Sequence, residues 1–165
     1  MKPKLRVMLD TNVYDSIISG NPTEFSKAIK NSKNVTVYGN KVIRGELRGI
    51  PMGHTSGGRS TRNWLLTTYD FIVGKHNLEV GNVVRFLAMQ YWESYHGGQS
   101  FANIIDGFLI VACASIHKLD IVCSQDARTM KSGRCLRIYL AVNKRNGFYT
   151  PRFISFGEFK GLIET

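Results

Sequence analysis

The amino-acid sequence predicts an α/β fold in which helices cover both faces of a central, mainly parallel β-sheet, a three-layer α/β/α sandwich. Two observations support this fold class. Short apolar segments typical of buried strands alternate with segments of helical periodicity, and strands that alternate with helices form parallel sheets flanked on both sides. Two of the apolar segments also end on an aspartate, at the strand end where open α/β sheets place their ligands.

The first part of the chain supplies strands and helices in alternation. The run LRVML at 5–9 is apolar and short, which favours a buried strand. Asn21 and Pro22 mark a turn, and Thr23 is a candidate helix N-cap. NVTVYG at 34–39 is rich in β-branched and aromatic residues and alternates, as strands do. We therefore expect strands over 5–9 and 34–39, and helices over 14–19, 23–30 and 41–48.

The remaining elements follow from similar signals. Gly, Pro and Ser cluster in GIPMGHTSGGRST, which predicts irregular structure there. The segment FANIIDGFLIVACASIHK, 101–118, is apolar almost all round, which is typical of a buried helix. We also expect helices over 62–73, 80–95 and 156–163, a buried strand in LDIVCSQD at 119–126, and possible strands over 136–142 and 152–155. No repeat or linker divides the chain, so we expect one domain over 1–165, with a longer helical and Gly-rich insertion at about 49–99.

Composition favours a cytoplasmic globular protein. Hydrophobic residues make up 43% of the 165, and no uncharged apolar run approaches the roughly 18 residues of a membrane helix. The apolar stretch behind the N-terminal cations is too short for a signal peptide. The three cysteines are odd in number and lack C-x-x-C spacing, which indicates buried free thiols in a reducing compartment.

The net charge of +10 favours a polyanionic partner such as nucleic acid. Residues 127–157 contain seven basic residues and no acid, with aromatic residues interleaved. Such a mixture can neutralise phosphates and stack on unpaired bases. Alternatively, the aromatic residues belong to the core and the charges form a solvated face. We favour a core role for the aromatic residues and a nucleic-acid role for the charges.

Two acids follow strands in the same way. Asp10 ends the first strand, where it could be the N-cap of the next helix or a chemical group. Asp126 ends the run that begins at Leu119. Because the carboxyl ends of parallel strands meet at one edge of a sheet, we expect both carboxylates at the same edge.

Two further acids lie in apolar surroundings. Asp106 is placed in the first turn of the buried helix, where it could complement the helix dipole and form a cap with Asn103. Burying a lone carboxylate is costly, however, unless it is paired or bound to metal. Glu46 lies between Val42 and Ile50 in an apolar row of its helix. Converging carboxylates repel one another, and Mg²⁺ or Mn²⁺, which prefers oxygen ligands, would relieve that repulsion.

The segments VMLDTNV, VIRGELRG and IIDGFLIVACASIHKLDIVCSQD resemble the three acidic motifs of the PIN-domain ribonucleases, of which VapC-type toxins are a prokaryotic group. The resemblance implies a PIN-like fold and an endoribonuclease that depends on Mg²⁺ or Mn²⁺. It also implies catalytic and metal-binding roles for Asp10, Glu46, Asp106 and Asp126, and supporting hydrogen bonds from Thr11, Asn12 and Ser124. Family members often follow the last acid with a second Asp and a Phe, whereas this chain continues ARTM at 127–130.

The leading hypothesis is therefore hydrolysis of RNA phosphodiester bonds by metal-activated water. Arg44, Arg48 and Arg128 would grip the RNA backbone. The hypothesis extends to a toxin of a toxin–antitoxin pair, with an antitoxin partner and a homodimeric state. The apolar residues that could form the dimer interface, or equally the core, are Val83, Phe86, Leu87, Tyr91 and Trp92.

Two other classes of function compete with this hypothesis. The first is a non-catalytic PIN-fold module that binds RNA or protein. The second is phosphate transfer through an aspartyl intermediate, suggested by the DTN that follows the first strand. That chemistry requires D-x-D, and the second position here is Asn12. GGRST also lacks the ending of a phosphate-binding Walker loop, and the four histidines are scattered.

Overall fold

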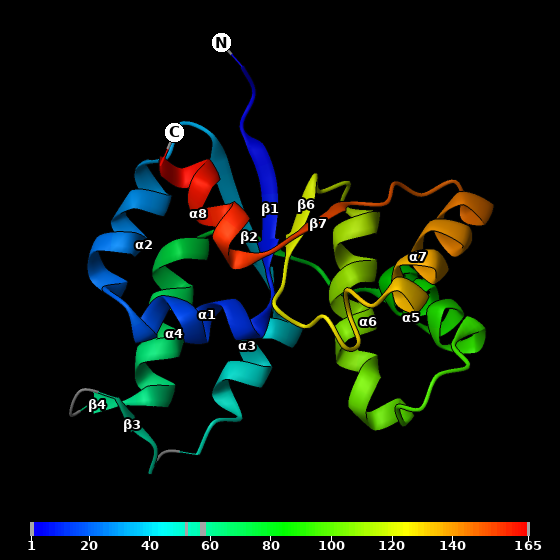
Figure 1. Ribbon diagram of the computed structural model, residues 1–165, viewed down its shortest axis with the longest axis horizontal. Helices are drawn as coiled ribbons and strands as arrows, with labels where there is room; N and C mark the ends of the chain where they lie inside the picture. The colour runs from blue at the N-terminus through cyan, green and yellow to red at the C-terminus, as the bar shows by residue number, and fades with distance from the viewer. Residues whose placement is uncertain (1, 52, 57–58, 165) are drawn as a thin grey trace.

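In the computed structural model, residues 2–51, 53–56 and 59–164 are described, and within these ranges five parallel strands form a central sheet (Figure 1). The spatial order of the strands is β5-β2-β1-β6-β7. Val7 of β1 is in register with Val37 of β2 on one side and with Ile121 of β6 on the other. The strands are β1 (Leu5–Leu9), β2 (Val35–Asn40), β5 (Asn77–Leu78), β6 (Ile121–Cys123) and β7 (Arg152–Ile154).

Helices cover both faces of the sheet. Figure 1 shows α1, α2, α4 and α8 on one side and α5, α6 and α7 on the other, while α3 contacts both α4 and α6. The helices are α1 (Thr11–Ser19), α2 (Pro22–Asn31), α3 (Lys41–Arg48), α4 (Thr61–Val73), α5 (Asn82–Ser94), α6 (Phe101–Ile116), α7 (Gly133–Asn146) and α8 (Phe156–Glu164). The predicted three-layer α/β/α sandwich with a parallel sheet is thus confirmed.

The core lies between these layers, and the central strands are buried on both faces. Val7, Met8 and Leu9 of β1 have no exposed surface, and all three residues of β6 are buried. A strand covered on both sides reads as a continuous apolar run, which is why both were visible in the sequence. The three cysteines are free and buried, as predicted.

One predicted strand was wrong. Residues 136–142 lie within the helix α7, whose buried residues are Cys135, Tyr139, Val142 and Asn143. These positions recur with helical rather than alternating spacing. The helix ends at Gly147, which adopts the left-handed conformation with φ of 74° that terminates many helices.

Smaller corrections concern turns and caps. Within the segment expected to be irregular, β3 (Thr55–Ser56) pairs antiparallel with β4 (Arg59–Ser60), and α4 then begins at once. Met52, Gly57 and Gly58 of that segment lie outside the described residues. The N-cap of α2 is Asn21 instead of Thr23, because Pro22 occupies the first helical position, which needs no N–H donor. The two-residue strand β5 was not predicted.

The segment 49–99 contributes to both helical layers, since α4 lies on one side of the sheet and α5 on the other. None of the helices in the described ranges is both long and apolar enough to cross a membrane.

Candidate active site

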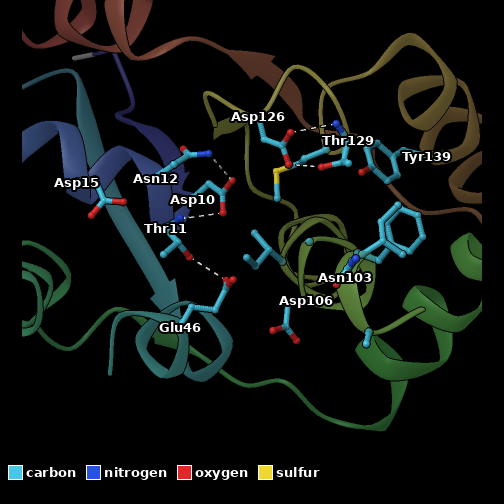
Figure 2. A pocket seen from close by; sticks show the side chains of 16 residues that line it. Asp10, Thr11, Asn12, Asp15, Glu46, Asn103, Asp106, Asp126, Thr129 and Tyr139 are labelled. Carbon is cyan, nitrogen blue, oxygen red and sulfur yellow. Dashed lines mark hydrogen bonds between the residues drawn. The ribbon is translucent and has the colours of Figure 1, made fainter. Parts of the chain in front are cut away.

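A cavity of about 440 Å³ opens at the carboxyl ends of β1 and β6, and five carboxylates line it. They come from separate elements: the end of β1, helices α1, α3 and α6, and the loop after β6. Figure 2 shows them around one hollow. The five are Asp10, Asp15, Glu46, Asp106 and Asp126. No Lys, Arg or His lines this cavity in the described part of the chain, so the cavity is strongly acidic although the protein is basic.

Asp10 is both the N-cap of α1 and a wall of the cavity. One carboxylate oxygen accepts a hydrogen bond from the Thr11 N–H at 2.8 Å, and the other accepts one from the Ser124 hydroxyl at 2.7 Å. Burial raises the pKa of Asp10; the bonds from Ser124 and Thr11 oppose this rise, and the charge of Asp126 adds to it. The sequence had left capping and chemistry as alternatives for Asp10, and the structure shows that its capping role does not remove it from the cavity.

Glu46 is a half-buried acid on α3, and Val42 on the same helix and Ile50 just beyond its end are half-buried too. The Thr11 hydroxyl donates to Glu46 Oε1 at 2.8 Å. Burial raises the Glu46 pKa to about 7, with the Thr11 bond opposing the rise and the charges of Asp10 and Asp106 adding to it. At neutral pH this carboxyl therefore exchanges a proton readily, unless a positive charge in the cavity favours its ionised form.

Asp126 is fixed by the loop that carries it. Its carboxylate accepts from the N–H groups of Arg128 at 3.2 Å and Thr129 at 3.0 Å, and also from the Thr129 hydroxyl. Burial by itself would raise the pKa of Asp126, but the bonds from the Thr129 side chain and the loop N–H groups outweigh it, and the pKa is lowered. The buried Ser124 joins the two strand-end acids, because it donates to Asp10 and accepts from the Asp126 N–H at 3.0 Å.

Asp106 differs from its prediction. It is exposed and lies in the second turn of α6, and among the described residues its side chain makes no hydrogen bond. The N-cap of α6 is Ser100, whose hydroxyl accepts the Asn103 N–H at 3.3 Å, so the expected cap between Asp106 and Asn103 was wrong. The reason is that the first turn of α6 projects beyond the core with Phe101 exposed. Asp106 nevertheless lines the cavity opposite Asp10 (Figure 2).

The other residues predicted for the site have diverse positions. Asn12 accepts the Gln125 N–H at 3.1 Å and thereby ties α1 to the loop after β6. Arg44 does not line the cavity; its guanidinium forms a two-pronged pair with Asp70 at 2.9 and 3.0 Å. Arg48 is exposed on α3, also away from the cavity lining, and Arg128 is exposed in the loop beside Asp126. That the three arginines bind RNA stays a prediction.

The lining residues that sequence reasoning missed include Asp15, Thr129 and Tyr139. Asp15 lies one helical turn after Thr11 and Asn12, so its spacing could have identified it. Thr129 follows Asp126 by three residues, an interval at which side chains commonly bond back to a turn. Tyr139 had no such signal, because it lies on the helix that was taken for a strand.

The lining suits a divalent metal ion in the kind of ligand it offers. All its charged groups are carboxylates, which are ligands preferred by Mg²⁺ and Mn²⁺. The pKa of Glu46 is raised mainly by burial, and the charges of Asp10 and Asp106 add to the rise. Within the described ranges, however, no three Asp, Glu, His or Cys side chains are gathered closely enough to hold a metal. Metal binding would therefore require the carboxylates to move closer together.

Comparison with known proteins places the fold. Neither a protein-family model nor a curated protein matches the sequence. Among solved structures, a chain of VapBC2 from Rickettsia felis bound to a DNA fragment from its promoter aligns with a TM-score of 0.54 and 11% identity, over 92% of this chain and 98% of that one. A chain of FitAB bound to an IR36 DNA fragment aligns with a TM-score of 0.53 and 14% identity, over 91% and 94%. Likeness at this identity concerns the fold alone, and the chain has the PIN-like fold that its acidic motifs predicted.

Proposed function

We propose that this protein is a ribonuclease that hydrolyses RNA phosphodiester bonds with Mg²⁺ or Mn²⁺ held by Asp10, Glu46, Asp106 and Asp126. The observation that carries the proposal is a cavity at the sheet edge where α/β folds bind ligands, lined by carboxylates and, among the described residues, by no Lys, Arg or His. A divalent cation bound there would polarise the phosphodiester and lower the pKa of water.

The residues around the cavity differ in what they can do for such a reaction. Asp10 and Asp126 are each fixed by several hydrogen bonds, so they suit the permanent holding of a cation. Glu46 has a pKa of about 7 and only its Oε1 is bonded to Thr11. We assign Glu46 Oε2, which the Thr11 bond leaves available, the role of orienting the attacking water, because a cation in the cavity would favour the ionised form of Glu46.

We further propose that the protein is the toxin of a toxin–antitoxin pair, acting in the cytoplasm and as a homodimer. Two things support this: the resemblance of its acidic motifs to those of VapC-type toxins, and the fold shared with chains of VapBC2 and FitAB. An antitoxin encoded beside it would be the partner. Co-expression of the adjacent reading frame, followed by purification of a stable complex, would test this part of the proposal.

The enzymatic proposal is tested with Asp10→Asn, which keeps the size of the side chain and removes its charge. In the presence of Mn²⁺, we expect cleavage of single-stranded RNA to fall by about 100-fold or more, since even partners outside the ligand shell contribute 10- to 100-fold. Glu93→Gln is the matched control, because Glu93 is exposed on α5 and does not line the cavity. Undiminished cleavage by Asp10→Asn would contradict the assignment.

A second candidate is a PIN-fold module that binds RNA or protein and cleaves nothing. It is favoured by the separation of the carboxylates and by the Thr129 bonds that occupy Asp126. Titration calorimetry separates the two functions. If neither Mg²⁺ nor Mn²⁺ binds at millimolar concentration while RNA still binds, the binding module replaces the enzyme.

A further inference from the structure

Helix α7 carries four basic residues on one exposed face. At 3.6 residues per turn they fall within an arc of about 100°, opposite the residues that α7 buries in the core. All four are exposed. They are Arg134, Arg137, Lys144 and Arg145, and we call them the α7 basic face.

The charge of this face is not neutralised by the protein. Residues 127–157 contain no acid, and within the described ranges none of the four forms an ion pair. Arg134 donates to the backbone carbonyl of His96 at 3.1 Å, which orients the guanidinium without cancelling its charge. Clustered charge of one sign attracts a polyanion and raises its local concentration.

The loop that precedes α7 begins at the acidic cavity, because Asp126 lines the cavity. The loop from Asp126 to α7 folds back on itself, with the Lys131 N–H donating to the Asp126 carbonyl oxygen at 2.9 Å, and it carries the exposed Arg128. On its inner side α7 supplies Tyr139 to the cavity lining. Figure 1 shows α7 on the outer side of α6, with the loop that follows β6 leading to it. One side of α7 therefore contributes Tyr139 to the cavity lining, and another side presents the cations.

The acidic cavity makes such a surface favourable for binding the proposed substrate. Five carboxylates repel phosphates, and basic side chains that hold the RNA backbone outside the cavity would offset this repulsion in addition to a bound metal ion. The distance from Arg134 to Arg145 along α7 is about 16 Å at 1.5 Å per residue. Arg134 and Arg145 are therefore far enough apart to contact different phosphates of one strand. Tyr149, half exposed just beyond α7, offers a ring on which a base can stack.

We propose that the α7 basic face binds the backbone of single-stranded RNA and leads it into the acidic cavity. The inference rests on the proposed function in taking the polyanion to be RNA. It adds the surface that binds this RNA, which the cavity alone does not identify. Arg44 and Arg48 on α3 are not part of this surface.

The test compares two triple variants of equal net charge. Arg137→Gln/Lys144→Gln/Arg145→Gln removes most of the α7 basic face. Lys27→Gln/Lys30→Gln/Lys33→Gln removes three exposed lysines in and just after α2, which lies on the other side of the sheet. Binding of a fluorescent single-stranded RNA is followed by anisotropy in EDTA, so that no cleavage interferes, and is repeated over a range of salt concentrations.

Each lost phosphate contact should reduce the slope of log K against log salt by about 0.7 for a single strand. The α7 variant should therefore lose about 2 from the slope and about 100-fold in affinity near 0.1 M salt, while the α2 variant stays close to the wild type. Equal losses in both variants would show a net-charge effect and overturn the inference. Unchanged binding by the α7 variant would overturn it too, and would leave the proposed cleavage, measured separately with Asp10→Asn, intact.

A third outcome identifies a different partner. If the wild-type protein fails to bind RNA but binds polyglutamate in a manner that depends on the α7 basic face, the surface belongs to an acidic protein segment. The inference is then wrong.

Discussion

Replacing Glu46 by Gln should stabilise the metal-free protein at neutral and alkaline pH. Glu46 is held near other carboxylates and is half-buried, and its pKa is raised from 4.5 to about 7, mainly by burial. The folded protein therefore resists the ionisation of this group. Gln keeps an oxygen that accepts a hydrogen bond from the Thr11 hydroxyl, but it carries no charge. The substitution therefore removes the free-energy cost of ionising this group and retains the hydrogen bond.

The magnitude follows from the two pKa values. A pKa rise from 4.5 to about 7 corresponds to at most about 3.4 kcal/mol at 1.36 kcal/mol per unit of pKa. Glu46 is only half-buried, and solvent screening reduces this to about 1–2 kcal/mol. For a chain of this length, 1 kcal/mol shifts the melting temperature by about 2–4 °C, so we expect a gain of about 3–6 °C.

The sign of the pH dependence is fixed by the direction of the shift. Because the folded-state pKa lies above the unfolded one, the folded state binds the proton more tightly. Below about pH 4.5 Glu46 is protonated in both the folded and the unfolded state, so it does not lower the free energy of unfolding. Its cost appears as the pH rises from 4.5 to about 7 and is complete above that. The difference in the free energy of unfolding between Glu46→Gln and the wild type should therefore grow as the pH rises through this range.

Thermal unfolding followed by circular dichroism in EDTA, at several pH values, measures the difference. Glu93→Gln is the control, since it removes an exposed acid outside the cavity and should show no comparable gain. A gain for Glu46→Gln that is absent near pH 8, or that persists unchanged near pH 4, would refute the reasoning. Mn²⁺ should in turn raise the melting temperature of the wild type more than that of Glu46→Gln.

Further predictions concern the core and are measured by urea unfolding. Tyr14→Phe should stabilise by about 1 kcal/mol, because the buried Tyr14 hydroxyl has no hydrogen-bond partner among the described residues; a loss would point to a partner. Tyr91→Phe should instead cost about 1–3 kcal/mol, since Asn143 Oδ1 loses its donor at 2.6 Å; an unchanged stability would contradict this. Gly39→Ala should cost about 1–3 kcal/mol, because a Cβ there would overlap the Tyr69 ring and hydroxyl; tolerance would mean that Tyr69 moves at little cost.

The strand-end acids could be predicted from sequence because two simple rules determine their place. A strand buried on both faces is a continuous apolar run, so the ends of β1 and β6 are visible as the points where Asp10 and Asp126 follow. Parallel strands then bring both ends to one edge. The position of Glu46 could also be predicted, because the helix that carries it, α3, has the bounds expected from the sequence.

Other features depended on tertiary structure that no local pattern encodes. The exposure of Asp106 depends on how far α6 extends past the core, and an apolar composition alone made the whole helix look buried. In α7, Leu136, Ile138 and Leu140 alternate with other residues and suggested a strand. Only as a helix does the segment place its cations on one face and Tyr139 in the cavity.

The distribution of charge in this protein argues for a ligand more strongly than any single residue. Of 12 acidic residues in a chain of net charge +10, five line one cavity that no base reaches in the described ranges. Burying a carboxyl group beside like charges costs stability, and the pKa of Glu46, raised first by burial and then by the charges of Asp10 and Asp106, expresses that cost. A fold optimised for stability alone would disperse these acids among its 22 basic residues. The metal-free protein should therefore gain stability when one acid is neutralised, and a divalent cation should provide that neutralisation in the working protein.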